Sequence, residues 1–384
     1  MKLEFQEYKV RKIVNVHQHV DGPWFWDKYS AQPYVGCRSG CVFCYLRGGR
    51  YIGRRDPDTF DTLIQVKVNA VELLQRELSR LEPDVIACGD WQRPAEDRYR
   101  LSRGMLGVMH DLGFPLLVIE RSPLITRDLD LLVEINRRSW VGVILSMSNV
   151  DPQLKRAFEP RSPSIKERLQ AMEKLTSVGI PVGIALMPII PLVGDDEEHL
   201  NEAVRATKDH GGSFVLGGGL TMEGAQAEWT LSAARLLDPE LETQWRGLYK
   251  WEHGGKPHYN PPRTYSARLG LMIRELCARH GLKDRMPRYI PYGPLGMNKQ
   301  IAERLFLKTY DLELEQATGY RIWAYRKAAW AVDEWSESIA ELYGSRGEAG
   351  LMELPGVGKS IAREIGKWLQ EYAIEQLASA RVTP

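Results

Sequence analysis

Apolar positions recur along the chain in two different patterns. Between about residues 31 and 225, short apolar runs are each followed by a longer segment with apolar positions at helical spacing. The expected strands are Gln65–Val68, Val85–Cys88, Leu116–Ile119, Val141–Ser148, Val182–Ile190 and Ser213–Gly217. The expected helices are Ala70–Leu81, Arg98–Leu112, Ile125–Arg137, Ser164–Ser177 and Glu197–Asp209. Strands without polar alternation are buried on both faces, so the pattern predicts α/β architecture with a parallel sheet or barrel, closed or partly closed.

The flanking segments have different patterns, which predict four regions. Residues 1–30 are an aromatic-rich lead-in, residues 31–225 the βα region, and residues 226–311 a helical extension. The extension is broken by Pro- and Gly-rich loops at His253–Tyr265 and Met286–Gly296, which no regular element tolerates. Residues 312–384 are helical in pattern, with one turn at Leu354–Lys359. We expect this last region to be a separate module.

Composition is typical of a soluble globular protein. Of the 384 residues, 43% are hydrophobic and 26% charged, and the formal net charge is +1, which excludes a wholly disordered chain. No apolar run approaches the length of a membrane span, and the first residues have no continuous apolar segment typical of a secretory signal. We therefore expect a cytoplasmic protein without a membrane partner, in a compartment where thiols stay reduced.

The cysteines are the strongest chemical signal. Three of the five, Cys37, Cys41 and Cys44, occur within eight residues, in YVGCRSGCVFCYLR. An odd number, clustered in this way, is not a disulfide framework. Three thiolates can hold three irons of a cubane cluster and leave the fourth iron open for a ligand. Zinc and inert thiols are the alternatives, although zinc sites usually have two paired halves and only one is present here.

The Cys-x3-Cys-x2-Cys spacing, with the aromatic Phe43 before the last cysteine, resembles the radical S-adenosylmethionine (SAM) superfamily. Further similarity to its spore photoproduct lyase-like branch lies in AQPYVGCRSGCVFCYLR, ERSPLITRDLDLL, LSMSNVDPQLKRAFEPRSPS and GIPVGIALMPIIP. The segments occur in the order found in that branch, and the resemblance as a whole covers roughly residues 28–290. The resemblance implies a partial (β/α)6 TIM-type barrel, consistent with six expected strands. It also implies two cofactors, a 4Fe–4S cluster and SAM, and an electron donor such as flavodoxin or ferredoxin.

The resemblance also assigns roles to individual residues. Cys37, Cys41 and Cys44 would bind the cluster, and Phe43 would lie near the adenine of SAM. Ser146 and Ser148 would face the ribose or the carboxylate of SAM, and Arg161 could bind the carboxylate bidentately. Arg121 stands where close relatives usually have Lys, which keeps the charge but changes the geometry. Ordinary strand-end and loop chemistry is the alternative for the serines and Arg161.

Cys88 ends an expected strand, just before Gly89-Asp90-Trp91. In a βα barrel the carboxyl ends of the strands surround the active site. Spore photoproduct lyases return a hydrogen atom to the product radical from a cysteine near the end of this strand, so the resemblance makes Cys88 a candidate catalytic donor. The alternative is a small buried apolar side chain, the commonest role of a free cysteine. Cys277, inside a helical pattern, is expected to be core.

Local charge around the cysteines favours nucleic acid, although the net charge does not. Between Asp27 and Asp56 there is no acidic residue. Basic residues can neutralise phosphates, and interleaved tyrosines can stack on bases. The expected DNA contacts in this stretch are Arg47, Arg50, Arg54 and Arg55. A solvated face beside a family-shaped loop is the alternative.

The C-terminal turn Leu354-Pro355-Gly356-Val357-Gly358-Lys359 resembles a helix-hairpin-helix motif, and residues 320–369 resemble the N-terminal domain of X-family DNA polymerases. Glycines permit a tight turn whose N–H groups hold a phosphate, so Gly356, Gly358 and Lys359 are expected to contact DNA without reading its sequence. Residues 317–381 hold eight Lys and Arg against nine Asp and Glu, so this module alone should bind weakly. A protein-docking bundle is the alternative.

Together these features predict a radical SAM lyase that acts on DNA. The expected reaction is repair of a thymine-type photolesion, begun by hydrogen abstraction by a 5′-deoxyadenosyl radical. One alternative is a radical SAM enzyme that modifies RNA or protein. Another is a non-enzymatic iron–sulfur protein that binds DNA or acts as a sensor.

Overall fold

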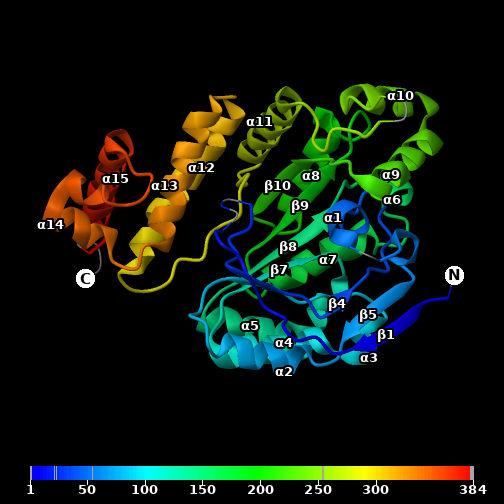
Figure 1. Cartoon of the computed structure of the whole chain (residues 1–384), viewed down its shortest axis with the longest axis horizontal. Helices are drawn as coiled ribbons and strands as arrows, with labels where there is room; N and C mark the ends of the chain where they lie inside the picture. The colour runs from blue at the N-terminus through cyan, green and yellow to red at the C-terminus, as the bar shows by residue number, and fades with distance from the viewer. Residues whose placement is uncertain (1, 21, 23, 54, 253–254, 381–384) are drawn as a thin grey trace. The chain divides into compact units, whose positions relative to one another are not determined.

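The computed structural model describes residues 2–20, 22, 24–53, 55–252 and 255–380, without the side chains of 49–50 and 375–380. The chain forms two compact units (Figure 1). The first contains residues 1–18 and 27–287, and the second contains residues 19–26 and 288–384. The second unit thus takes in α12 (Leu295–Leu314) and a short segment before the first strand of the barrel, whereas the sequence expectation began the module at 312.

The first unit is built on a sheet of parallel strands, as the sequence predicts. In the described part of the chain its order is β10-β9-β8-β7-β6-β3-β2, and only β2 runs antiparallel to its neighbour. The strands are β2 (Asn15–Val16), β3 (Tyr29–Ala31), β6 (Ile86–Cys88), β7 (Leu116–Glu120), β8 (Val141–Met147), β9 (Val182–Ile189) and β10 (Phe214–Gly219). Six parallel strands with connecting helices are the partial (β/α)6 barrel that was expected.

Helices cover one face of this sheet (Figure 1). They are α2 (Ala70–Leu78), α4 (Leu101–Leu112), α5 (Leu129–Arg138), α7 (Ile165–Thr176) and α8 (Glu197–Asp209). The short helix α3 (Ala95–Tyr99) packs on the small sheet of β4 (Tyr34–Val35) and β5 (Leu63–Lys67), and α6 (Pro152–Phe158) packs with α9 (Gly224–Leu237) and α10 (Pro239–Leu248). The main core fills the layer between sheet and helices, where Leu74 of α2 and Met105 of α4 pack with Ile86 and Val118. The apolar spacing of these helices was predictable because one stripe of each faces the sheet.

One expected barrel strand belongs elsewhere. The run Gln65–Val68 lies in β5 (Leu63–Lys67), which pairs with β1 (Glu4–Tyr8) and β4 (Tyr34–Val35) in a separate small sheet. The burial of β5 alternates, with Ile64 and Val66 inside. A strand covered on one face alternates in this way, whereas barrel strands are covered on both. The missing barrel strand is β3, only three residues long, which the sequence placed in the lead-in.

Further helices complete both units. In the first, η1 (Tyr45–Arg47) and α1 (Gly49–Ile52) follow the cysteine loop, η3 (Pro123–Asp128) precedes α5, and α9 (Gly224–Leu237), α10 (Pro239–Leu248) and α11 (Arg263–Arg279) follow the sheet. In the second, α12 is followed by α13 (Gly319–Glu334), α14 (Ile339–Leu351) and α15 (Lys359–Ala380). Among the helices of the described residues, none combines the length and apolar character needed to cross a membrane.

The segment 19–26 is held in the second unit by aromatic contacts. The rings of Trp26 and Phe306 lie edge to face with centroids 5.7 Å apart. His19 stacks on Trp330 at 4.3 Å, and the Trp330 indole donates to the Val20 carbonyl at 3.0 Å. Aromatic pairs of this kind add to the free energy of apolar burial, so these few residues are an integral part of the helical unit.

Candidate functional site

The three clustered cysteines lie on one loop, between β4 and η1, at the side of the barrel where the strands end. Two glycines allow the loop to fold. Gly36 has φ +94° and a Cβ there would lie 2.7 Å from the Leu63 carbonyl oxygen. Gly40 has φ +59°, and a Cβ there would overlap the Arg161 guanidinium. Both positions therefore need glycine for conformation and for space.

Hydrogen bonds fasten the loop to distant segments. The Cys37 N–H donates to the Phe60 carbonyl at 3.0 Å, and the Val42 N–H donates to the Phe158 carbonyl at 3.1 Å. The Thr230 hydroxyl, on α9, donates to the Val42 carbonyl at 3.0 Å. The loop is thus fixed largely through its backbone.

The thiols suit a cluster of irons. All three are free, Cys41 is buried, and Cys37 and Cys44 are half-buried. Burial raises the pKa of the Cys37 thiol to about 11, and the neighbouring Cys44 acts in the same direction. No three His, Cys, Asp or Glu side chains within the described ranges lie close enough together to hold one metal ion. A cubane cluster places each thiolate on a different iron, so its ligands do not converge on a single point.

Arg121 connects the cysteine loop to the barrel. Its Nη1 donates to the Cys41 sulfur at 3.1 Å and lies 2.8 Å from Glu159 Oε2. Arg121 follows the end of β7, so the barrel itself delivers a positive charge to the sulfur. A guanidinium at this position compensates the negative charge of a thiolate-bound cluster or of a carboxylate ligand. The positive charge expected from the sequence is therefore in place beside Cys41.

Glu159 is the centre of a buried network of hydrogen bonds and ion pairs. In the sequence this glutamate is visible only as one position of the segment LSMSNVDPQLKRAFEPRSPS. Its carboxylate accepts from the Ser148 N–H at 2.9 Å, from the Ser162 hydroxyl at 2.9 Å and from Arg168 Nη1 at 2.8 Å. Burial alone would raise the pKa of Glu159, but the Arg121 and Arg168 guanidiniums hold it at about 2. Because two guanidiniums share one carboxylate, the group has a net charge of one positive unit. The Arg121 guanidinium presents this charge to the cysteine loop.

The expected cofactor-binding residues gather around this network. The Ser146 carbonyl accepts from Arg168 at 2.9 Å, and the buried Ser148 hydroxyl accepts from the Asn149 amide at 2.8 Å. Arg161 pairs with Asp61 and donates to the Arg38 carbonyl at 3.2 Å. Buried polar atoms without a partner also lie here, namely Asn149 Oδ1 and Arg168 Nε and Nη2. Unpaired buried polar atoms beside free thiols fit a site that binds a polar ligand.

Phe43 is in a different environment from these residues. It is 6% exposed and belongs to an apolar cluster with Phe158, Leu231 and Trp245, from α6, α9 and α10. Its ring therefore anchors the middle of the cysteine loop in this second core. A contact between Phe43 and the adenine of SAM stays a prediction.

Cys88 lies at the end of β6, as expected, but on the side of the strand that faces the helices. It is 2% exposed and packs in the main core with Ile86 and Val118. Because successive side chains alternate across a strand, Ala87 faces the interior of the barrel and Cys88 faces the helical layer. Burial raises the pKa of the Cys88 thiol to about 12. This position does not support a hydrogen-donor role, which stays a prediction.

The four arginines expected to contact DNA are not equivalent. Arg47 is buried, with its guanidinium 4.0 Å from the Trp229 ring centroid and 3.8 Å from Asp61. Its partners give it a structural role, because a buried arginine cannot reach a phosphate. Arg55 donates to the carbonyls of Tyr51 and Ile52 at 3.1 Å each. Arg54 and the side chain of Arg50 lie outside the described residues.

The C-terminal turn has the geometry of a helix hairpin. It joins α14 to α15, with Leu354 and Val357 buried and Gly356, Gly358 and Lys359 exposed. Gly356 has φ +78°, and Lys359 is the first residue of α15. The apolar pair anchors the turn, so its glycines and the start of α15 face solvent.

The comparisons with known proteins agree with both halves of this description. A family model described as the radical SAM superfamily matches residues 32–205, and one described as a helix-hairpin-helix domain matches residues 297–374. An uncharacterised protein of Mycobacterium tuberculosis (strain ATCC 25618 / H37Rv) is 29% identical over 261 residues, covering 66% of this chain and 75% of that protein. An uncharacterised protein of Methanocaldococcus jannaschii is 28% identical over 202 residues, covering 52% of this chain and 73% of that protein.

Among solved structures, the fold is similar to that of a spore photoproduct lyase complexed with a dinucleoside spore photoproduct. The TM-score is 0.53 with 16% sequence identity, over 73% of this chain and 81% of that one. A mutant of spore photoproduct lyase with bound SAM and the dinucleoside photoproduct gives the same TM-score, identity and coverage. At this level of identity the likeness concerns the fold. Residues 32–205, which contain the cysteine loop and most of the parallel sheet, therefore match a radical SAM domain, and residues 297–374 match a helix-hairpin-helix domain.

Proposed function

We propose that the protein is a radical SAM enzyme that acts on DNA and repairs a thymine-type photolesion, in the manner of a spore photoproduct lyase. The observation that carries the proposal is the presence of a radical SAM domain and a helix-hairpin-helix domain in one chain. The first domain provides radical chemistry, and the second is a module that holds DNA backbone without reading sequence. The fold likeness to a lyase solved with a dinucleoside photoproduct agrees with this substrate class.

The cofactors are those of the superfamily, a 4Fe–4S cluster and SAM. We propose Cys37, Cys41 and Cys44 as the cluster ligands, because they are the free thiols of the loop that opens the matched region. When bound, the cofactors supply a carbon-centred radical that takes a hydrogen atom from the substrate. An electron donor such as flavodoxin or ferredoxin would reduce the cluster.

The chain's own residues would bind and orient these groups. Arg121 and Arg161 are the candidates for the SAM carboxylate, because both guanidiniums lie beside the cysteine loop and Arg can bind a carboxylate through two parallel hydrogen bonds. Ser146 and Ser148, at the end of β8, would contact the ribose or the carboxylate. Glu159 would hold Arg121 and the Ser148 backbone in position.

Exposed tyrosines next to the loop favour a base as substrate. Tyr45 directly follows Cys44 and is 53% exposed, and Tyr51 is 43% exposed. Their rings lie edge to face with centroids 5.2 Å apart. Aromatic rings held in the open beside a reactive centre are suited to stacking on an unpaired base. We place the DNA contacts of this region on these tyrosines and Arg55, and leave Arg47 out.

The test is a product analysis under anaerobic conditions. Reduced, reconstituted protein with SAM is incubated with irradiated DNA, unirradiated DNA, RNA or protein, and the products are identified by mass spectrometry. Formation of 5′-deoxyadenosine that is stimulated by irradiated DNA, with loss of a photoproduct, is the expected result. Stimulation only by RNA or protein would assign a different substrate. If no 5′-deoxyadenosine forms under any condition, the remaining alternative is a non-enzymatic iron–sulfur protein that binds DNA or acts as a sensor.

A further inference from the structure

The turn after β6 is one of the most firmly held segments of the barrel unit. Trp91 is fully buried, its indole donates to Asp128 Oδ2 at 2.7 Å, and its backbone N–H donates to Glu120 Oε2 at 2.6 Å. The preceding residue is also fixed, because the Asp90 N–H donates to Ser102 Oγ at 2.9 Å and the Asp90 carbonyl accepts from it at 2.6 Å. The turn therefore cannot move independently of β7 and α4.

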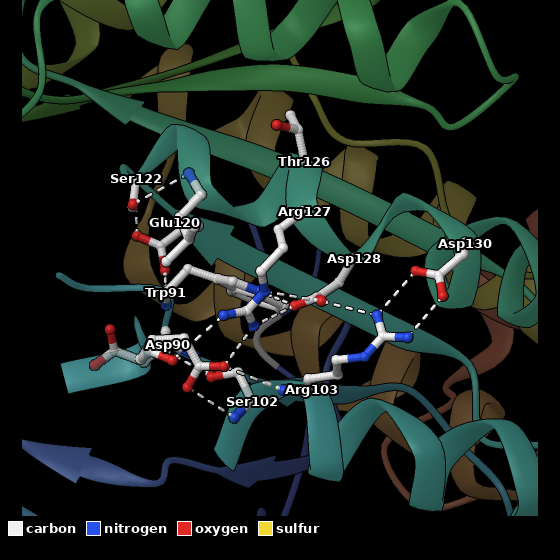
Figure 2. Close-up of polar contacts among 12 residues, drawn as sticks. Asp90, Trp91, Ser102, Arg103, Glu120, Ser122, Thr126, Arg127, Asp128 and Asp130 are labelled. Atoms are coloured by element: carbon white, nitrogen blue, oxygen red, sulfur yellow. Dashed lines mark hydrogen bonds and ion pairs between the residues drawn. The ribbon is translucent and has the colours of Figure 1, made fainter. Parts of the chain in front are cut away.

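Figure 2 shows the residues that hold the Trp91 side chain in place. Asp128 is completely buried and is held by Arg103 Nη1 at 2.9 Å and by Arg127 Nη2 at 2.6 Å. Arg103 is fixed in turn by Asp130 at 2.7 Å. An ion-pair network in which every member has a partner keeps one arrangement rather than several. The indole of Trp91 is thus clamped in a rigid support.

The next residue, Gln92, extends from this support to the cysteine loop. Its side chain is 6% exposed. Nε2 donates to the Gly36 carbonyl at 2.9 Å and to Asp90 Oδ2 at 2.8 Å, and Oε1 accepts from the Arg38 N–H at 3.3 Å. Both donors and the acceptor of the amide are used. A flipped amide would place its oxygen against two other oxygens, so the orientation is fixed by the partners.

The two loop groups that Gln92 holds are the neighbours of Cys37 on either side. The Gly36 carbonyl precedes Cys37 and the Arg38 N–H follows it, while the Cys37 N–H itself is bonded to the Phe60 carbonyl. Cys41, in contrast, is approached through its sulfur by Arg121. The peptide groups on both sides of Cys37 are therefore held by a single side chain, which comes from the turn after β6.

We propose that Gln92 is a positioning residue for Cys37, which holds the first cysteine in its ligating place before any cluster is present. The proposal rests on the assignment of Cys37 as a cluster ligand but not on the identity of the substrate. Without Gln92, the backbone of the Gly36–Arg38 segment gains conformational freedom. Cluster binding must then restrict this backbone again. The expected effects are faster local opening in the apoprotein and faster loss of iron from the loaded protein.

The experiment compares Gln92→Met with wild type and with Gln170→Leu, a change at an exposed glutamine on α7. Methionine keeps the length of the side chain and removes the three side-chain hydrogen bonds. Hydrogen exchange in the apoprotein should be about tenfold faster at residues 36–39, as the loss of two ordinary hydrogen bonds to the loop implies. Exchange in β8 and β9 should be unchanged. In the reconstituted protein, iron transfer to a chelator should also be about tenfold faster.

Two outcomes would overturn the proposal. In the first, Gln92→Met keeps both rates within about twofold of wild type. In the second, exchange accelerates equally throughout the barrel, which makes Gln92 an ordinary stabilising residue. If Gln92→Met does not fold, Gln92→Asn is measured in the same way, because its amide is one methylene shorter and cannot keep the hydrogen bonds to both Gly36 and Arg38. Its failure to loosen residues 36–39 selectively would equally reject the proposal. Substrate assays play no part, so failure here is distinguishable from failure of the proposed function.

Discussion

The Nη1 atom of Arg121 lies 2.8 Å from Oε2 of Glu159, and this pair joins the end of β7 to the Glu-Pro-Arg segment after α6. The same guanidinium donates to the sulfur of Cys41. The direction of the Arg121 side chain is therefore set by the Glu159 carboxylate on one side and by the Cys41 sulfur on the other. Because Arg168 shares the carboxylate, Glu159 determines where two buried positive charges lie.

The first prediction concerns Glu159. Replacing it with Gln leaves the Arg121 and Arg168 guanidiniums without a counter-charge in a buried site, and breaking a buried ion pair in this way costs about 3–5 kcal/mol. We expect a fall of that size in the free energy of unfolding of the apoprotein, measured with urea at neutral pH. Arg137→Met, which removes an exposed ion pair with Glu134, is the control and should change it by less than about 1 kcal/mol. Equal small effects in both variants would contradict the prediction.

The second prediction concerns pH. The pKa of Glu159 is held at about 2, below its ordinary value. A depressed carboxyl pKa gives stability that is fully present above the ordinary value near 4.5 and is lost as the pH falls toward about 2. The wild-type apoprotein should therefore lose more stability between about pH 5 and pH 3 than Glu159→Gln does. Urea titrations of both proteins across this range make the test, and parallel curves would show that Glu159 titrates normally.

The third prediction concerns the cluster. Anaerobic reconstitution should give about four irons per chain, with one iron open. Alanine at Cys37, Cys41 or Cys44 should abolish the iron–sulfur absorption, because each thiolate holds a different iron. Cys277→Ala, in the main core, is the control and should keep it. Stoichiometric zinc without iron–sulfur absorption would contradict the assignment.

The fourth prediction concerns Cys88. If this residue returns a hydrogen atom, Cys88→Ala should still cleave SAM but should give adducts or abortive products in place of the repaired one. Its position in the helical layer leads us to expect the other result, an unchanged product profile and a loss of about 1 kcal/mol from the small cavity. Product analysis beside thermal melting separates the two. Altered products at unchanged stability would restore Cys88 as the donor.

The fifth prediction concerns the hairpin turn. Lys359→Ala should weaken DNA binding and lower the slope of the logarithm of affinity against the logarithm of salt by about 0.9, the value for one phosphate contact. Lys367→Ala on α15, which removes a lysine 3.9 Å from Glu371, is the matched control. Point variants are needed because truncation at 312 would cut α12 near its end and remove α13, which packs along it. If wild type, Lys359→Ala and Lys367→Ala all show the same dependence of DNA affinity on salt, the turn does not contact a DNA phosphate through Lys359.

The sequence predicted the architecture where one physical signal dominated. The strands β6 to β10 are mostly apolar because both faces are largely covered, and their helices carry a single apolar stripe. Tyr29–Ala31 was missed because three residues are too few to show a period. Residues 65–68 were placed in the wrong sheet, although their alternation of polar and apolar residues is that of a strand covered on one face.

The cysteine loop was predictable because its chemistry is local in sequence. The residues that hold it in place were not. Glu159 acts across 38 residues through Arg121. Gln92 acts across 56 and 54 residues through the Gly36 and Arg38 peptide groups. Arg47 shows the reverse error, since a basic residue in a basic stretch turned out to be buried against Trp229 and Asp61. Contacts between residues far apart in the sequence decide whether such side chains are buried, and these contacts cannot be recognised from one sequence.

Residues 19–26 belong to the helical unit whose other members begin at Arg288. On the ribosome, this segment is made first and its partners emerge roughly 260 residues later. At typical synthesis rates the delay is roughly 13 to 50 s. Throughout that time Trp26, which is 2% exposed in the finished protein, has no Phe306 to cover it. Residues 27–287 of the barrel unit are therefore synthesised before the partners of segment 19–26 exist, so this segment can pack into the helical unit only late in synthesis.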